Sequence, residues 1–404
     1  MSPDGVIDRS TSIRALARNR PFLVLWSSYS VSLLGNGLTS AALALLAHQL
    51  VGGEASMIFG IALTIRIIGR VVASPFSPLL AEKFGSRILL ASAALLSAGI
   101  TLTFIGVNSV WQIYLVVLGL NLVDAVFVPL YKSVIPGLVG TRLYPKAQAL
   151  GTVSYELSNV AAPALAALAI AWFGFRTNFV LDALTFLLVA IAIGSIRELK
   201  QPAIKTKEKE RSGAMTGFRM MWKRIPLRLS LIYSWITALA GSYVIVATIS
   251  YAMGPLNLSA VGYAWIMAAF GLGSTLGALL FGWMNEHTRH TLFRLSPLAM
   301  ALGLGISGLG ESVTMLALAW IISGLGYGMA NVGVNQMLAE HATESERPHV
   351  FAAQFSFSHA AWGLFYPLAG WTSTTIGFMP GAILFTLVIA GGMLWIYQLR
   401  RNSR

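Results

Sequence analysis

The sequence predicts an all-α integral membrane protein that crosses the bilayer twelve times, in two pseudo-symmetric six-helix halves. Of its 404 residues, 56% are hydrophobic and only 11% are charged, whereas a soluble globular domain carries about 25% charged residues. Twelve apolar stretches approach the length of roughly 20 residues that a membrane-spanning helix needs. A single long charged segment divides these stretches six and six.

The twelve stretches are interpreted as helices because strands of a membrane barrel would be shorter and would alternate in polarity. The apolar run after Arg20 is longer than the roughly 7–15 residues of a cleavable signal peptide, so it is assigned as the first span. The predicted spans are 22–49, 56–80, 88–107, 110–131, 148–172, 177–196, 228–251, 259–284, 292–309, 312–338, 351–371 and 378–399.

The basic residues predict the orientation of the chain. If the N-terminus is cytoplasmic, all but three of the 28 Lys and Arg residues lie in cytoplasmic segments. Arg176 lies on the outer side, and Arg66 and Arg70 lie inside a span. The positive-inside rule then makes residues 1–21 and 400–404 cytoplasmic. Because the cations lie between apolar runs, the net charge of +13 indicates topology rather than nucleic-acid binding.

The composition also limits the cofactors that we expect. The absence of cysteine excludes disulfides, Cys-ligated zinc and thiol catalysis. The glycine-rich runs Gly271-Leu272-Gly273 and Gly324-Leu325-Gly326 lie within spans. No strand precedes them and no Walker lysine follows, so they predict close helix packing rather than nucleotide binding. We therefore expect no cofactor and no nucleotide, with a small-molecule substrate and membrane lipid as the partners.

Residues 197–227 form a basic cytoplasmic linker between an N-terminal half, 22–196, and a C-terminal half, 228–399. The centre of the linker is too highly charged to be buried, which predicts a solvated segment. Residues 215–226 mix apolar and basic side chains, as in a short amphipathic helix at the inner membrane surface. A simple tether is the favoured interpretation, and lipid sensing is the alternative.

An internal repeat relates the two halves at an offset of about 204 residues. Pro163 in span five corresponds to Pro367 in span eleven. Ser86-Arg87, after span two, likewise corresponds to Thr288-Arg289, after span eight. Two parallel repeats of this kind are typical of transporters that hold a substrate near the midplane and rock the halves around it.

The loop after span two resembles a signature of the major facilitator superfamily, roughly Gly-x-Leu-Ala-Asp-Arg-x-Gly-Arg-Arg. Residues 78–87 place Glu82 and Lys83 where the family has Asp and Arg, and they keep Gly85 and Arg87. The first glycine and one basic residue of the pattern are replaced. The resemblance extends over nearly the whole chain, and it implies a monomer in which this loop latches the halves as a cytoplasmic gate. Ordinary topology charge is the alternative reading of Glu82 and Arg87.

Within the superfamily, the chain looks most like the branch of enterobactin-type siderophore exporters, macrolide efflux pumps and nickel-resistance pumps. Asp182 near the start of span six is part of that likeness. In span five the chain also resembles the small-residue pattern of antiporters, with Ala or Ser in place of Gly. The positions that carry this pattern are Ala149, Ser158, Ala162, Pro163, Ala166 and Ala167. The resemblance implies export, and the small number of histidines argues against a metal cargo.

Two positive and two negative residues on three helices lie deep inside predicted spans, where a charge is costly and usually faces a partner or a cavity. Arg66 and Arg70 lie one turn apart on span two, and Asp124 and Glu156 lie at comparable depth on spans four and five. The functional hypothesis is a proton-coupling site, in which an acid exchanges a proton and an arginine holds an anionic substrate. The alternative is a purely structural ion-pair cluster, although such pairs are seldom worth their desolvation in lipid.

Polar and aromatic residues inside spans are candidates for a substrate cavity. By the repeat, His359 corresponds to Tyr155, which is adjacent to Glu156. Side-chain amides inside a span can bind a substrate or can join helices, a role that contributes under about 1 kcal/mol on average. The candidates are Asn36, Asn121, Tyr155, Asn331, Asn335, Gln354, His359 and Trp362.

Together these patterns predict a secondary transporter of the bacterial cytoplasmic (inner) membrane. The favoured function is export of a drug-like compound or a siderophore by proton antiport with alternating access. A proton-coupled importer of a small metabolite is the main alternative. An integral-membrane enzyme and a metal-ion exporter are less favoured, because the polar groups lie within the spans and form no catalytic or histidine-rich motif. A channel is less favoured, because two pseudo-repeated six-helix halves favour alternating access.

Overall fold

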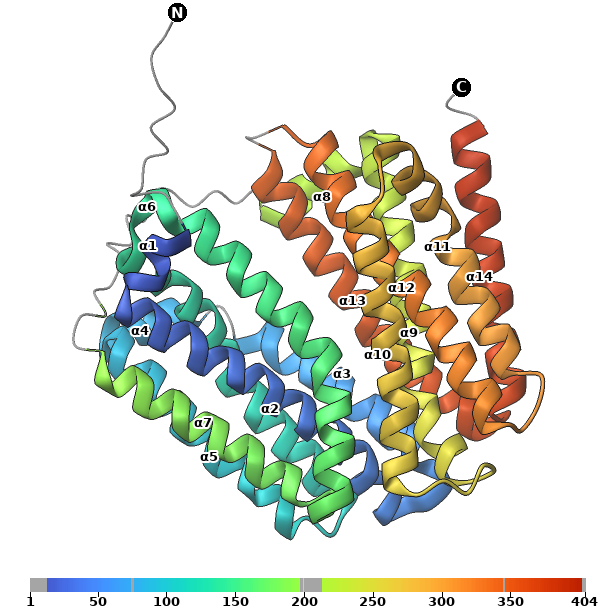
Figure 1. Ribbon diagram of the computed structural model, residues 1–404, viewed down its shortest axis with the longest axis horizontal. Helices are drawn as coiled ribbons and strands as arrows, with labels where there is room; N and C mark the ends of the chain where they lie inside the picture. The colour runs from blue at the N-terminus through green and yellow to red at the C-terminus, as the bar shows by residue number, and fades with distance from the viewer. Residues whose placement is uncertain (1–12, 74–75, 197–198, 200–212, 344–345, 402–404) are drawn as a thin grey trace, which may run out of the picture. The chain divides into compact units, whose positions relative to one another are not determined.

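The computed structural model describes residues 13–73, 76–196, 199, 213–343 and 346–401. Every regular element within these ranges is helical (Figure 1). The helices are α1 Ile13–Arg18, α2 Arg20–Val51, α3 Ala55–Ala73, α4 Ser77–Phe84, α5 Ser86–Thr103, α6 Val110–Phe173, α7 Thr177–Ser195, α8 Gly213–Lys223, α9 Ile225–Met253, α10 Ala260–Trp283, α11 Glu286–Ser307, α12 Val313–His341, α13 Arg347–Thr375 and α14 Phe378–Arg401, with short 3-10 turns at Gly52–Glu54 and Phe104–Gly106.

The helices confirm the all-α membrane fold, and each predicted span falls on helical segments. Within the described residues, eight helical segments are long and apolar enough to cross a membrane. Predicted spans 148–172, 292–309 and 351–371 lie outside these eight but fall on α6, α11 and α13. Most of the charged linker, 200–212, lies outside the described residues.

Helix α6 carries two predicted spans, 110–131 and 148–172, and it bends sharply between them. Gly140 has φ 73° and ψ 164°, so two helices meet at this residue. A side chain would strain a backbone with this positive φ, whereas glycine adopts it at little cost. Gly140 therefore allows the chain to leave one helix and begin the next without a longer loop.

The chain divides into two compact units that do not coincide with the two sequence halves. The first unit comprises Met1–Ala42, Ile68–Ala162 and Phe173–Thr206. The second unit comprises Leu43–Ile67, Pro163–Trp172 and Lys207–Arg404. Two segments of the N-terminal half, 43–67 and 163–172, thus cluster with the C-terminal helices, and the domain boundary in the 197–227 linker stays a prediction.

Direct contacts inside the second unit explain why residues 43–67 belong to it. The Ser56 Oγ donates to the Ser250 Oγ at 2.8 Å, which joins α3 to α9. One helical turn beyond Gly60, the Thr64 Oγ1 donates to the Gly363 carbonyl of α13 at 3.0 Å. A β-carbon at Gly60 would lie 2.4 Å from the Tyr366 carbonyl oxygen, so only glycine allows this close approach.

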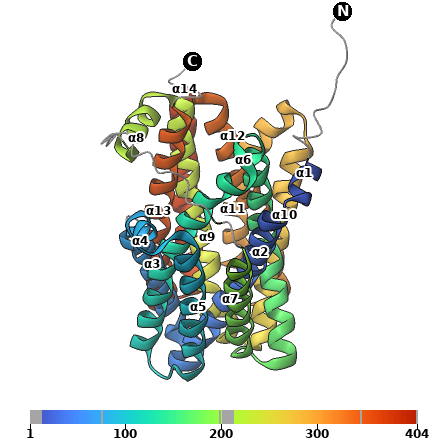
Figure 2. The same cartoon turned by 90° about the vertical axis from the view of Figure 1, so that its left-hand side faces the viewer.

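The core of the first unit gathers side chains from α2, α5, α6 and α7. Phe22, Leu90, Val134 and Ile193 are each at most 1% exposed and represent these four helices in turn. Helices α5 and α7 pack along each other (Figures 1 and 2). Apolar contacts of this kind hold the unit together. The few polar side chains buried among them need hydrogen-bond or ion-pair partners.

The second unit is organised around α9, which is the most buried of the long helices. Most of its side chains are buried, and Thr248 accepts a hydrogen bond from the Trp320 Nε1 of α12 at 3.0 Å. Helices α10 and α12 meet at glycines: β-carbons at Gly273 and Gly324 would lie 2.2 Å and 2.3 Å from carbonyl oxygens of the facing helix. These contacts confirm that the glycine-rich runs serve close helix packing.

Candidate substrate and coupling site

An ion pair joins two helices of the first unit inside predicted spans. The Nη2 of Arg70 on α3 lies 2.8 Å from the Oδ2 of Asp124 on α6. The Asp124 side chain is 10% exposed and that of Arg70 is 38% exposed. At the preceding residue, Gly69, a β-carbon would lie 3.3 Å from the Asn121 Cβ, so glycine lets α3 approach α6 there. Two of the four predicted intramembrane charges are thus partners.

Aromatic side chains lie beside this ion pair. Tyr29 of α2 stacks on Tyr131 of α6, with ring centroids 4.1 Å apart, and more distantly on Phe127 at 6.0 Å. The Tyr29 hydroxyl lies within electrostatic reach of Asp124 and Arg70. The group of Tyr29, Phe127 and Tyr131, called here the aromatic wall, therefore lies next to two charges; Phe127 and Tyr131 are buried in the core, and Tyr29 is half-buried.

The ion pair leaves part of the arginine unused. The Nε of Arg70 is buried and has no hydrogen-bond partner among the described residues. The same is true, within that part of the chain, of the Oδ1 of Asn121, whose Nδ2 donates to the Val117 carbonyl at 2.8 Å. Buried polar atoms are usually satisfied by protein or water, so this donor and this acceptor indicate a place that a polar molecule would stabilise.

The other residues of the predicted charge cluster are placed less completely. Arg66 lies one turn before Arg70 on α3, is half-buried and takes part in interactions of its own. Glu156 lies on α6, but its side chain is outside the described part of the structure. The neighbouring Tyr155 is 53% exposed. The participation of Arg66, Glu156 and Tyr155 in a site stays a prediction.

The second unit presents its own aromatic group on α10, α12 and α13. Trp362 packs against Tyr366 with ring centroids 5.1 Å apart, and against Tyr327 at 6.3 Å. Tyr327 also contacts Phe270 at 5.3 Å. Trp362 and its neighbours Tyr327 and Tyr366 are half-buried, so part of each ring is accessible. Aromatic side chains with one accessible face suit a flat or amphipathic ligand.

Two asparagine candidates extend from this aromatic group along α12. The Nδ2 of Asn331 donates to the Tyr327 carbonyl at 3.0 Å, one turn back on the same helix. The Nδ2 of Asn335 donates in the same way to the Asn331 carbonyl at 3.0 Å, and Asn335 is exposed. Each side-chain amide oxygen remains an acceptor for a further group. On α2, Asn36 is half-buried, and its backbone carbonyl accepts from the Ser40 hydroxyl at 2.9 Å.

Gln354 and His359 of α13 have different surroundings. Gln354 is 7% exposed; its Nε2 donates to the Ser234 Oγ of α9, and its Oε1 accepts from the Ser230 Oγ at 3.5 Å. Gln354 therefore joins two helices, which was the alternative reading of such amides. His359 stacks on Phe355 with ring centroids 3.8 Å apart, and Phe355 is 62% exposed.

The predicted gate loop makes its contacts within the first unit. Gly85 has φ 78°, a left-handed conformation that favours glycine, and it ends α4 before α5 begins. Glu82 and Lys83 are exposed on α4. The Nη2 of Arg87 donates to the Gly194 carbonyl in the last turn of α7, where the helix dipole favours a cation. Arg87 thus fixes the loop to α7, and a latch to the other half stays a prediction.

Sequence reasoning missed the environment of Asp182. This residue of α7 is fully buried, and its Oδ2 accepts a hydrogen bond from the Thr39 Oγ1 of α2 at 2.6 Å. A β-carbon at Gly35 would lie 2.3 Å from the Asp182 Oδ1, so glycine makes room for the carboxyl group. The sequence indicates Asp182 only through the family resemblance, although an acid inside an apolar span is itself a signal.

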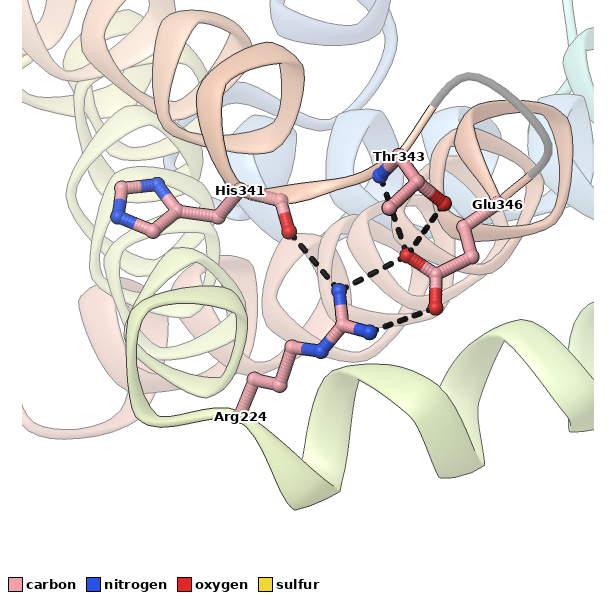
Figure 3. Close-up of polar contacts among 4 residues, drawn as sticks. All are labelled: Arg224, His341, Thr343 and Glu346. Atoms are coloured by element: carbon pink, nitrogen blue, oxygen red, sulfur yellow. Dashed lines mark hydrogen bonds and ion pairs between the residues drawn. The ribbon is translucent and has the colours of Figure 1, made fainter.

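A second feature missed from the sequence lies between α8–α9 and α12–α13 (Figure 3). Arg224 donates from Nη1 to the Glu346 Oε2 at 2.8 Å and from Nη2 to the Glu346 Oε1 at 2.7 Å. Arg224 also donates to the His341 carbonyl at 3.0 Å, and Glu346 accepts from the Thr343 hydroxyl at 2.9 Å. The hydrogen bonds from Arg224, then those from Thr343, lower the pKa of Glu346 to about 2.

The described residues contain no group of three or more His, Cys, Asp or Glu side chains that would hold a metal ion. The chemically distinctive groups are instead an ion pair within predicted spans and two sets of aromatic side chains. The long apolar helices define a multi-pass integral membrane protein.

The comparison with protein families agrees with this class. The family model of the Major Facilitator Superfamily matches residues 25–253 and again residues 231–404. The chain therefore belongs to the Major Facilitator Superfamily.

Curated relatives cover most of the chain. It is 24% identical over 338 residues to the uncharacterized MFS-type transporter YfiS of Bacillus subtilis, covering 79% of each protein. It is 25% identical over 357 residues to the multi-drug resistance efflux pump PmrA of Streptococcus pneumoniae, covering 84% of this chain and 87% of the relative.

Solved structures share the fold at low sequence identity. A bacterial homologue of the human lysosomal transporter Spinster, in an inward-facing unoccupied conformation, has a TM-score of 0.70 at 13% identity, covering 96% of this chain and 98% of the other. The nucleoside transporter NupG has a TM-score of 0.67 at 14% identity, with coverage of 94% and 98%.

Proposed function

We propose that this transporter exports small organic molecules from the cytoplasm of a bacterium across its inner membrane, driven by the proton gradient. The 25% sequence identity to a multi-drug resistance efflux pump supports export. The ion pair between Arg70 and Asp124 carries the proposal, because it places a proton acceptor and a cation together inside the spans.

In this mechanism Asp124 exchanges the proton. Protonation of its Oδ2 removes the negative charge and with it the ion pair to the Arg70 Nη2. The released guanidinium then has two unoccupied edges, because its Nε has no partner among the described residues even in the paired state. An anionic group on the substrate is bound by this guanidinium. Loss of the proton restores the ion pair and displaces the anion, so an anionic substrate held in this way moves together with the proton. A cationic substrate instead competes with the proton for the Asp124 carboxylate, and this competition couples the two movements in opposite directions.

The substrate class follows from the surroundings of the pair. In the first unit, the half-buried ring of Tyr29 offers an apolar contact beside the pair. In the second unit, considered by itself, Trp362 and its neighbours present half-buried aromatic rings. A drug-like aromatic compound or an aromatic siderophore with a carboxylate satisfies both the apolar and the charged features. Glu156, which the sequence predicted as the alternative proton acceptor to Asp124, remains part of the proposal in that role.

The test is transport into inverted membrane vesicles with an imposed pH gradient, using a fluorescent cationic dye and then an anionic aromatic siderophore. Asp124→Asn is expected to lower gradient-driven uptake at least tenfold. Arg70→Gln is expected to reduce uptake of the anionic siderophore more than that of the dye. Glu54→Gln removes an exposed acid outside the pair and is the matched control.

Normal gradient-driven transport by a stably expressed Asp124→Asn protein would exclude the ion pair as the coupling site. If inverted vesicles accumulate neither compound but right-side-out vesicles do so with the same gradient, the direction is import. Each outcome is interpreted only for variants whose membrane level and melting temperature match those of the unmodified protein.

A further inference from the structure

Helix α8 uses one face to dock on the rest of the second unit. Met221 is fully buried, and a β-carbon at Gly217 would lie 2.0 Å from the His349 carbonyl oxygen of α13. Phe218 packs on Phe357 of α13 with ring centroids 5.7 Å apart. The apolar face of this amphipathic helix is therefore covered by protein.

The opposite face of α8 carries two cations and an indole. Arg219, Trp222 and Lys223 are exposed and are spaced three and four residues apart, so they share one side of the helix. Arg228 of α9 joins them: its guanidinium lies 5.1 Å from the Trp222 ring centroid, and its Nε donates to the Trp222 carbonyl at 2.9 Å. These four residues are called here the cation–indole surface.

The Arg224–Glu346 contact fixes this surface in place (Figure 3). Arg224 separates α8 from α9, and it is engaged by both carboxylate oxygens of Glu346 and by the His341 carbonyl. Since Glu346 is occupied by Arg224 and Thr343, it does not neutralise the neighbouring cations. Helix α8 contains no acidic residue of its own. The cation–indole surface is thus held in position and keeps its positive charge.

The location of the surface indicates which anion it meets. Arg228 is the fourth residue of α9, where predicted span 228–251 begins, so the surface lies at the boundary between lipid and water. Tryptophan is enriched at this boundary. Basic residues next to a span attract the phosphate groups of anionic lipids, which are present at high density at the membrane surface, whereas soluble anions are not enriched there.

We propose that the cation–indole surface binds the headgroup of an anionic phospholipid, with its phosphate between Arg219, Lys223 and Arg228 and its glycerol region against Trp222. The site goes beyond substrate transport and does not depend on the direction of transport. It assigns the end of the linker, for which the sequence favoured a simple tether, to lipid recognition.

The test measures lipid binding to the purified full-length protein in a neutral detergent. Native mass spectrometry gives the fraction of protein that retains a first added lipid as a function of lipid concentration, for phosphatidylglycerol and for phosphatidylcholine. Phosphatidylglycerol is expected to bind at least tenfold more tightly. Arg219→Gln/Lys223→Gln is expected to weaken its binding by roughly twenty-five-fold, since each basic residue contributes about a factor of five.

Arg294→Gln/Arg401→Gln is the matched control, because it removes the same charge from exposed positions on α11 and α14. This control is expected to bind phosphatidylglycerol like the unmodified protein. The proposal is overturned if the α8 double variant binds as before, if the control loses as much affinity, or if phosphatidylcholine binds equally well. Competition by inorganic phosphate at matching concentrations would show an adventitious anion site instead of a lipid site.

Trp222→Ala separates lipid binding from simple charge attraction. If the indole contacts the glycerol region, this variant loses part of its phosphatidylglycerol affinity with no change in charge. An unchanged affinity would remove Trp222 from the site. The melting temperature of every variant in detergent shows whether the fold is intact before its lipid binding is compared.

Discussion

A β-carbon added at Gly328 of α12 would lie 1.9 Å from the Ser274 carbonyl oxygen of α10, which is backbone. One added at Gly37 of α2 would lie 2.1 Å from the Ala162 Cβ, which is a side chain. The first contact belongs to the second unit and the second to the first unit. The contrast recurs at Gly35, which makes room for the Asp182 carboxyl group rather than for a neighbouring backbone.

The placement of charge follows the same contrast. The first unit holds Arg70 and Asp124 within predicted spans. In the second unit, the ion pair of Arg224 with Glu346 lies beyond the span ends. Backbone packed directly on backbone has little freedom to rearrange, whereas charged side chains between helices can change partners. The difference teaches that α10 and α12 of the second unit are held by backbone contact, whereas the first unit places charged side chains between its helices.

The largest expected effect is at the backbone contact of the second unit. Gly328→Val forces methyl groups into the α10 backbone. We therefore expect the free energy of unfolding to fall by more than about 3 kcal/mol, the upper range for overpacked cores. The measurement is the yield of monodisperse protein and its melting temperature. Gly282→Val of α10 is the control, because a β-carbon there meets no atom within 4 Å. Equal yields and melting temperatures for the two variants would show that backbone contact at Gly328 does not stabilise the second unit.

A smaller effect is expected at the side-chain contact of the first unit. Gly37→Ala places a methyl group against Ala162 and is expected to cost about 1–3 kcal/mol. Because the obstacle is a side chain, the double variant Gly37→Ala/Ala162→Gly is expected to recover most of the melting temperature. Failure of this rescue would show that α2 and α6 are held by backbone contact, as α10 and α12 are.

Much of the fold was predictable because lipid imposes strict rules on sequence. A chain in the bilayer must satisfy its backbone internally, so long apolar runs can only be helices here. The glycine-rich runs also predicted close packing, and Gly273 and Gly324 confirm it. The clustering of residues 43–67 with the second unit was not predictable, because it depends on contacts such as Ser56 with Ser250 that connect distant parts of the sequence.

The candidate site was predictable only in part. Because charges inside a membrane need partners, the sequence pointed to four residues as candidates for the site. Asp124 and Glu156 lie at similar depths, so the sequence did not show which of the two acids pairs with an arginine. The structure pairs Arg70 with Asp124, while the coupling role of the pair stays a prediction. Arg224 and Glu346 were missed because they are separated by 122 residues and lie outside the spans, where charges are common and carry no signal of their own.

The smallest expected effect concerns Glu346, which directly precedes α13 and lies outside the predicted spans. Its pKa is lowered to about 2, below the ordinary 4.5, chiefly by the hydrogen bonds from Arg224 and then by those from Thr343. A lowered pKa stabilises the folded state above pH 4.5, and this contribution is lost as the pH falls from 4.5 towards 2. Because the carboxylate is near the surface, we expect a change in melting temperature of at most a few degrees.

The measurement compares the melting temperatures of the unmodified protein and Glu346→Gln from about pH 7 to about pH 3. The difference is expected to stay constant down to about pH 4.5 and then to shrink, because acid removes the carboxylate that the variant already lacks. Arg224→Gln is expected to abolish the same pH-dependent part. A difference that persists unchanged to the acid end of this range would mean that shape rather than charge holds α8 to α13, and the cation–indole surface would then owe its position to Met221 and Phe218 alone.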